Sequence, residues 1–181
     1  MSLPLGHAAV GLSIAVLLTE KKQLKVKNFH IWLWTIILSG LPDIDFFVYF
    51  FIDNSGEAFS YRHKFTHSIL FYFIIVALLY RFMPWRSGWL SVVIPLSILI
   101  SHSVLDSLYK DSPVTFFLPF IDNGYSFNLL PDIKLRGNMS ILLQSGTIIQ
   151  MFLEGVIGML LLLSAIVVRN SREIKEIKIK K

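Results

Sequence analysis

The chain has 181 residues, of which 54% are hydrophobic and only 16% are charged, and its mean hydropathy is +0.63. Ordinary soluble domains carry about 25% charged residues, so this composition argues against a soluble domain and indicates a surface that contacts lipid. The sequence contains no cysteine, which excludes disulfides, thiol nucleophiles and thiolate metal sites. Any metal must therefore be held by His, Asp or Glu.

Apolar runs separated by charged breaks predict an all-α fold, a polytopic membrane helix bundle of about five transmembrane helices. Each span takes about 20 apolar residues, so five or six spans would use up the chain. We expect one membrane-embedded domain over residues 1–168, followed by a basic cytoplasmic tail over residues 169–181. The expected spans are Leu3 to Thr19, Phe29 to Ile52, Ser68 to Met83, Trp89 to Ser107 and Ile141 to Val168.

The basic residues predict the orientation of the bundle. Lys and Arg near span ends are biased toward the cytoplasm, and five spans place most of the 17 basic residues and all four Trp on one side. We therefore expect an inner (plasma) membrane protein with its N-terminus outside and its C-terminus in the cytoplasm. Because topology accounts for the net charge of +5, nucleic acid is not expected as a partner.

Several ionisable residues lie within or beside these spans, where they are costly unless paired or liganded, and they are therefore functional candidates. The predicted topology places all of them except Glu154 in the same outer layer of the membrane. They are His7, Asp43, Asp45, His63, His67, His102, Asp106 and Glu154.

The spacing of these residues supports a common site. His102 and Asp106 are four positions apart, so a helix projects both from one face, and His63 and His67 have the same spacing. Asp43 follows Pro42, which lacks an N–H and breaks a helix, so Asp43 and Asp45 can both turn inward.

A polar stripe of Thr35, Ser39 and Asp43 at helical spacing indicates that Asp43 faces the interior. Asp45 is a ligand, a second acceptor behind the ligands, or both.

The expected ligand set combines imidazoles and carboxylates and suits zinc, with manganese or iron as alternatives, as one or two ions. The set is His7, Asp43, Asp45, His67, His102 and Asp106. His63 either joins it or contacts lipid headgroups beside Arg62 and Lys64. Glu154, on a polar face of the last run, either takes part in chemistry or is a hydrogen-bonded packing group.

At these residues the sequence resembles the LexA-regulated, membrane-bound, metal-dependent hydrolases, a group of small inner-membrane proteins. The resemblance covers about residues 6 to 130 and implies metal-dependent hydrolysis. The matching stretches are Gly6-His7, Leu41-Pro42-Asp43-Ile44-Asp45, Arg62-His63-Lys64-Phe65-Thr66-His67-Ser68, His102-Ser103-Val104-Leu105-Asp106-Ser107-Leu108, Pro119-Phe120 and Tyr125-Ser126.

The ligand order is also similar to that of zinc-dependent bacterial phospholipase C and related nucleases. That similarity implies that His7 binds one ion and that His67 and His102, with Asp43 or Asp45, bind another. It further implies that Asp106 bridges the two ions.

We therefore hypothesise a hydrolase acting at the outer membrane–water boundary, on a phosphoester of a lipid or lipid-linked substrate, through a metal-activated water. Asp43, Asp45 and Asp106 are the catalytic candidates. The candidates for substrate binding are Arg62, Lys64 and Arg136. The connection from Leu108 to Ser140 either covers the site or is a plain extramembrane loop. The alternatives are a divalent-metal transporter and a non-catalytic membrane adaptor stabilised by its metal.

Overall fold

The computed structural model describes residues 4–19, 29–45, 65–85, 88–110, 112–130 and 145–179, with the backbone alone described for 145–147, 150–151 and 173–179. This part of the chain forms five α-helices and no strand, which confirms the all-α prediction. The helices are α1 (Pro4–Leu18), α2 (Phe29–Gly40), α4 (Ile69–Leu79), α5 (Leu90–Ser107) and α6 (Ser145–Ile179). Two short 3-10 helices, η1 (Leu41–Asp43) and η3 (Phe65–His67), follow α2 and precede α4.

Two of these helices are long and apolar enough to cross a membrane, namely α5 and the stretch Phe152–Arg172 of α6. The helices α1 and α4 are apolar but shorter, with 15 and 11 residues. The predicted span from Phe29 to Ile52 is interrupted after its first part. Helix α2 ends at Gly40, and the 3-10 helix η1, which contains Pro42, follows it. The count of five spans stays a prediction.

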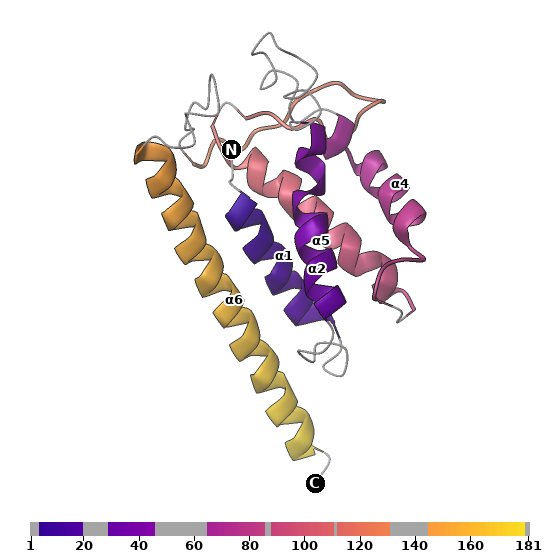
Figure 1. Ribbon diagram of the computed structural model, residues 1–181, viewed down its shortest axis with the longest axis vertical. Helices are drawn as coiled ribbons and strands as arrows, with labels where there is room; N and C mark the ends of the chain where they lie inside the picture. Colours follow the sequence, from indigo (N-terminus) through magenta and orange to yellow (C-terminus); the bar gives the residue numbers. More distant parts are fainter. Residues whose placement is uncertain are drawn as a thin grey trace.

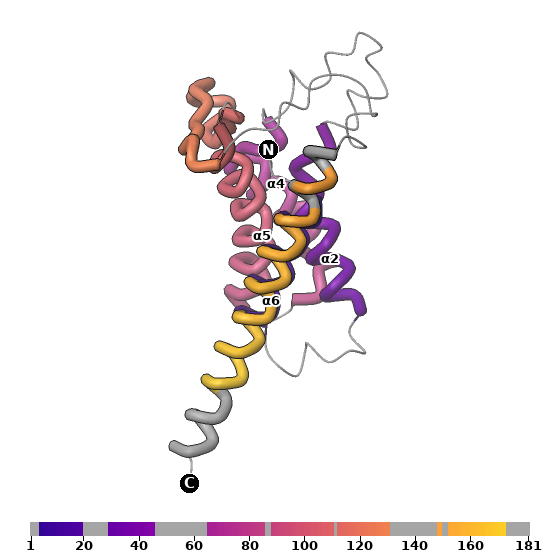
Figure 2. The backbone as a smooth tube through the Cα atoms, turned by 90° about the vertical axis from the view of Figure 1, so that its left-hand side faces the viewer, coloured from indigo at the N-terminus to yellow at the C-terminus, as the bar shows by residue number. Residues whose placement is uncertain are grey.

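The last helix is longer than the hydropathy indicates. It continues through Arg169 to Ile179, so the basic tail expected after residue 168 is helical over most of its length. Hydropathy falls where charged residues begin, but Arg, Lys and Glu are good helix formers and allow the helix to continue. Figure 2 shows the C-terminal part of α6 extending beyond the other helices.

The bundle is arranged around α1 and α5. Helix α1 packs against α2, α5 and α6, and α5 also contacts α2 and α4. In Figure 1, α6 and α4 lie on opposite sides of this group. The main apolar core lies between α2, α4, α5 and the turn after α4, and consists of Ile31, Leu38, Tyr72, Val76, Met83, Trp85, Ile94, Ile98 and Leu99.

Small residues allow α1 to approach its neighbours closely. A Cβ atom at Gly11 would overlap the Ser39 hydroxyl of α2, and one at Gly158 of α6 would overlap Ala9. Such contacts between small residues are typical of helix packing in membranes. Because His7 lies one turn before Gly11, this packing also fixes the position of His7 beside α2 and α5.

Candidate metal centre

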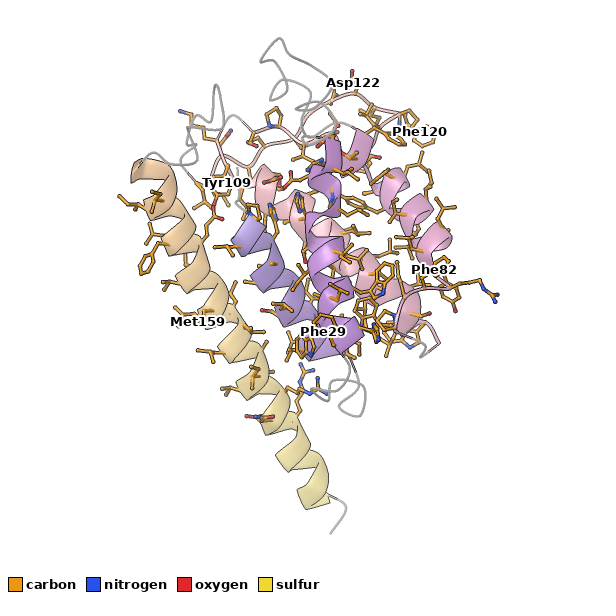
Figure 3. The ribbon with its side chains drawn as sticks, viewed as in Figure 1. Phe29, Phe82, Tyr109, Phe120, Asp122 and Met159 are labelled. Carbon is orange, nitrogen blue, oxygen red and sulfur yellow. The ribbon has the colours of Figure 1, made fainter. Side chains whose placement is uncertain are left out.

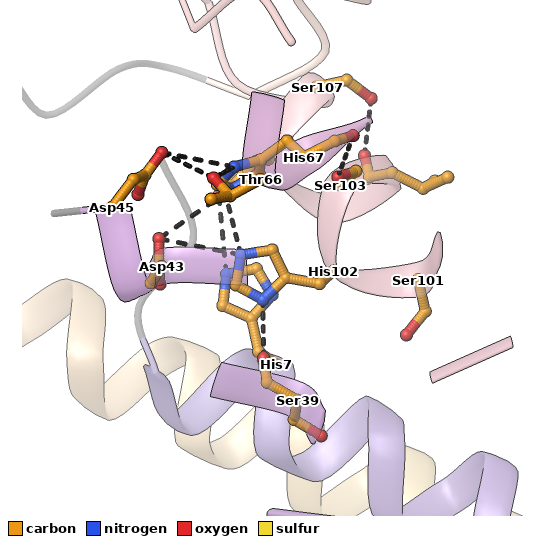
Figure 4. A network of polar contacts seen from close by, with 12 residues as sticks. His7, Ser39, Asp43, Asp45, Thr66, His67, Ser101, His102, Ser103 and Ser107 are labelled. Atoms are coloured by element: carbon orange, nitrogen blue, oxygen red, sulfur yellow. Dashed lines mark hydrogen bonds and ion pairs between the residues drawn. The ribbon is translucent and has the colours of Figure 1, made fainter. Parts of the chain in front are cut away.

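Three separate stretches of the chain bring four metal-ligand residues together at one end of the bundle. Asp43 closes η1, His67 closes η3, and His102 and Asp106 lie one turn apart in the last part of α5. All four side chains are buried, and one donor atom from each lies within 4.8 Å of the other three. Figure 4 shows Asp43, His67 and His102 facing one another. This cluster can hold a metal ion.

The distances within the cluster match the spacing of ligands around an ion. His102 Nε2 lies 3.4 Å from Asp106 Oδ2 and 3.7 Å from Asp43 Oδ1. His67 Nε2 lies 3.5 Å from Asp106 Oδ2 and 4.0 Å from Asp43 Oδ1. Ligands about 2.0–2.1 Å from zinc in a tetrahedron lie about 3.3 Å from one another, whereas hydrogen bonds to nitrogen are normally about 2.9 Å long.

The end of α2 positions Asp43 in the four-residue cluster. Thr35 and Ser39 donate their hydroxyls to carbonyls one turn earlier, at 2.8 and 2.7 Å, so both are satisfied while fully buried. The polar stripe thus faces the interior, as its spacing predicts. The 3-10 turn at Pro42 then leaves both Asp43 and Asp45 buried, as we expect for a helix break.

A hydrogen bond from its ring to a backbone carbonyl orients His102. Its Nδ1 lies 2.6 Å from the Ser39 carbonyl oxygen, an acceptor only, so Nδ1 carries the proton. The other ring nitrogen, Nε2, then presents a lone pair to the cluster, and it is buried there without a hydrogen bond in the described part of the chain. Ligating histidines typically have this arrangement, with the second nitrogen bound to a carbonyl or carboxylate.

The backbone of His67 is fixed by the start of α4 and by α5. Ser68 caps α4, because its hydroxyl accepts from the Phe71 N–H at 3.2 Å and donates to the Phe65 carbonyl at 2.7 Å. Ser103 donates to the carbonyl of His67 at 3.2 Å and is itself hydrogen-bonded to the buried Tyr72 hydroxyl. Helix α5 therefore holds the backbone of His67 as well as supplying its neighbours in the cluster.

A second chain of contacts orients the ring of His67. The Thr66 hydroxyl donates to Asp45 Oδ2 at 2.7 Å, and its oxygen lies 3.2 Å from His67 Nδ1. A hydroxyl has one hydrogen, so Thr66 accepts from Nδ1–H. The lone pair of Nε2 then faces Asp43 and Asp106. Asp45 is thus placed behind the four-residue cluster, which is one of the roles that its sequence position left open.

The charges of the cluster fit a divalent cation. Two imidazoles that present lone pairs are neutral, and Asp43 and Asp106 contribute two negative charges. A divalent ion cancels this charge in a buried site where unpaired carboxylates are costly. Two nitrogen and two oxygen donors suit zinc.

His7, in the first turn of α1, borders the cluster. Its ring stacks on that of His102 with centroids 3.6 Å apart and an angle of 11° between the planes. Its Nε2 lies 3.5 Å from Asp106 Oδ1, and both ring nitrogens are buried without a hydrogen bond to the described residues. Asp106 therefore faces His67 and His102 with one oxygen and His7 with the other.

The remaining candidates lie elsewhere. Glu154 of α6 is outside the four-residue cluster and accepts a hydrogen bond of 2.6 Å from the Tyr109 hydroxyl, just beyond α5. Four further candidates lie outside the described residues, namely Arg62, His63, Lys64 and Arg136.

Sequence reasoning did not assign roles to the hydroxyls that position the histidines. Thr66 precedes His67, and Ser103 follows His102. This adjacency is the only signal in the sequence, because the hydrogen bonds depend on how the helices are placed.

Comparison with known proteins places the chain in a family. Neither the curated proteins nor the solved structures give a significant match. The model of a family described as YdjM inner membrane protein matches residues 1–172. This agrees with the membrane class indicated by the composition, and hydrolysis stays a prediction. Since the match covers almost the whole sequence, the chain belongs to the YdjM family of inner membrane proteins.

Proposed function

We propose that this protein is a membrane-embedded metal-dependent hydrolase acting on a phosphoester of a lipid or lipid-linked substrate. The observation that carries the proposal is the buried cluster of Asp43, His67, His102 and Asp106, whose donor atoms lie within 4.8 Å of one another. A bound divalent ion would supply Lewis acidity, activating water and polarising the phosphoester.

The residues of the chain would bind the ion and orient its ligands. Asp43, His67, His102 and Asp106 would hold the ion, and the Ser39 carbonyl and Thr66–Asp45 pair would keep both imidazoles aimed at it. These outer contacts support a preorganised site, in which ligands do not need to rotate when the ion or substrate arrives.

His7 has two roles open to it within this proposal. Its Nε2 lies 3.5 Å from Asp106 Oδ1, so His7 would help to hold a second ion, or it would act as a proton acceptor during hydrolysis. Counting ions distinguishes these roles: His7→Ala would lower the metal content from two ions to one in the first case and would leave it unchanged in the second.

We further propose that the centre faces the outer leaflet. The basic residues predict that orientation, and the positions of Arg81 and Arg169 support it. Arg81 follows α4 and Arg169 donates to the Val16 carbonyl near the end of α1, whereas His67 and His7 lie at the starts of these helices.

The test is metal analysis and a phosphoester panel on the purified full-length protein. We expect His102→Ala and Asp106→Ala to lose the metal and to lower hydrolysis by at least about a hundredfold, since even substitutions behind the ligands cost about 10–100-fold. His30→Ala is the matched control, because His30 is exposed and lies at the start of α2. Retention of both metal and activity by the two cluster variants would disprove the proposal.

A structural metal is the second candidate, and the four closely spaced protein donors favour it, because structural zinc sites are filled by four ligands. It predicts that wild-type protein binds one ion, hydrolyses no phosphoester and unfolds on chelation. A catalytic centre instead requires a ligand position that is open to water and substrate.

A further inference from the structure

The connection after α5 exposes an unusual amount of apolar surface. Over residues 112–130, which we call the aromatic loop, the only charged residue is Asp122. Phe120, Phe127 and Leu129 are 82%, 60% and 72% exposed. Single exposed apolar residues are ordinary, but a contiguous group marks a binding surface. The other exposed apolar residues of this loop are Phe117, Ile121, Tyr125 and Leu130.

The loop backbone is held in place, so the exposure does not come from an open chain. Val114 and Tyr125 exchange two backbone hydrogen bonds of 3.0 and 2.9 Å, and the rings of Phe117 and Tyr125 pack edge to face at 5.7 Å. Val114 is fully buried. The apolar side chains are thus presented outward from a closed loop, and binding them would cost little additional ordering.

The same loop is attached directly to the metal centre. The N–H of Ile69, which is two residues after His67, donates to the Phe116 carbonyl at 2.9 Å. The Phe127 N–H donates to the Ser107 carbonyl, and two further N–H groups of the loop donate to the Leu108 carbonyl. Ser107 and Leu108 directly follow Asp106 in the sequence. Any surface that the loop binds therefore lies beside the four-residue cluster.

The position of the loop is that of an element at a membrane surface. Figure 2 shows it projecting sideways from the end of α5, and Figure 3 shows Phe120 and Asp122 at the end of the bundle opposite Phe29 and Phe82. The helices also carry exposed apolar side chains, including Phe73 and Ile74 of α4 and Val104 of α5. In an inner membrane protein that helical surface is the one that contacts lipid.

We propose that the aromatic loop binds the lipid surface at the metal-centre end of the bundle, with Phe120 and Phe127 inserted among the acyl chains. The lack of basic residues within the loop indicates apolar insertion rather than attraction to anionic headgroups. This inference deepens the proposed function and rests on it in one respect: the loop would hold lipid headgroups beside the cluster and thereby select a bilayer-embedded phosphoester.

The absence of cysteine allows a direct test in proteoliposomes of zwitterionic and anionic phospholipid. Phe120→Cys is labelled with an environment-sensitive fluorophore, and Asn123→Cys, three residues away in the polar turn, is the matched control. We expect spin-labelled acyl chains to quench the label at 120 more strongly than the label at 123. Aqueous iodide should show the opposite order.

Two results would overturn the inference. Iodide quenching at 120 equal to that of the control would place the loop in water. Protection from both quenchers that persists in detergent and depends on protein concentration would identify a second protein copy as the occupant.

The link to hydrolysis is tested separately with Phe120→Ser/Phe127→Ser. If lipid is the substrate, KM for a bilayer-embedded phosphoester should rise about tenfold, with kcat and hydrolysis of a soluble short-chain phosphoester unchanged. An unchanged KM would disprove headgroup presentation. If the wild-type protein hydrolyses no phosphoester, the proposed function fails, and the quenching experiment still decides whether the loop binds lipid.

Discussion

The contact chain from His67 through Thr66 to Asp45 predicts that removing one hydroxyl weakens metal binding. Thr66→Val keeps the branched shape of the side chain but removes the donor to Asp45 at 2.7 Å and the acceptor 3.2 Å from His67 Nδ1. The ring of His67 then loses the group that fixes its protonated nitrogen, and rotation or a change of tautomer becomes accessible. Thr66 itself lies outside the four-residue cluster and donates its hydroxyl to Asp45 behind it.

Two independent estimates of the free-energy cost of Thr66→Val agree. A hydrogen bond to a charged group contributes about 1.5–3 kcal/mol, and substitution of a group that orients a ligand costs about 10–100-fold in metal affinity, or about 1.4–2.8 kcal/mol. We therefore expect the zinc Kd of Thr66→Val to rise about 10–100-fold. Thr66→Ser keeps the hydroxyl and should stay within about threefold of wild type, since it loses only a methyl group.

The assay is competition for zinc against a chromophoric chelator, with the full chain in detergent. Asp45→Asn should weaken binding similarly, and the double variant should cost about as much as Thr66→Val alone, because both changes break the same chain. The reasoning is refuted if Thr66→Val binds zinc within about twofold of wild type, or if the two substitutions are additive.

Three further predictions concern stability. Gly11→Ala should destabilise the protein by about 1–3 kcal/mol in denaturation assays, because its Cβ overlaps the Ser39 hydroxyl, and adding Ser39→Ala should recover most of the loss; no recovery would contradict the contact. Tyr109→Phe should cost about 1.5–3 kcal/mol in thermal stability without changing the metal content, and a parallel loss of metal would place Glu154 at the site. Zinc at a hundred times its Kd should stabilise wild type by about 2.7 kcal/mol in the same melts, and Asp106→Ala should show no such gain.

The grouping of Asp43, His67, His102 and Asp106 could be predicted from the sequence by simple rules of helix geometry and membrane topology. The i,i+4 spacing of His102 and Asp106 places both on one face of α5, and Pro42 ends the regular helix just where Asp43 must turn inward. Basic residues assigned His7, Asp43 and His67 to one end of the bundle, and the structure brings all three side chains to His102 or Asp106.

The contacts behind the cluster were not predictable, because they join residues whose relation is set by packing alone. The Ser39 carbonyl accepts from His102, 63 positions away, only because α2 lies against α5. Glu154 likewise finds Tyr109 across 45 positions, and nothing in its sequence neighbourhood separates a bound carboxylate from a catalytic one. The helical continuation of α6 beyond residue 168 was likewise not predicted, because hydropathy and helix propensity disagree there.

The lengths of the helices explain how a buried pair of carboxylates is tolerated in this protein. At 1.5 Å per residue, α1 is about 22 Å long and α4 about 16 Å, both shorter than a hydrocarbon core of about 30 Å, whereas α5 is about 27 Å. The cluster and the neighbouring His7 lie where these helices begin or end: His7 is in the first turn of α1, Asp43 follows α2 and His67 precedes α4. Asp43 and His67 therefore sit in 3-10 turns at the end of the bundle, and a divalent ion there would require no carboxylate to lie at the centre of the bilayer, where its cost is greatest.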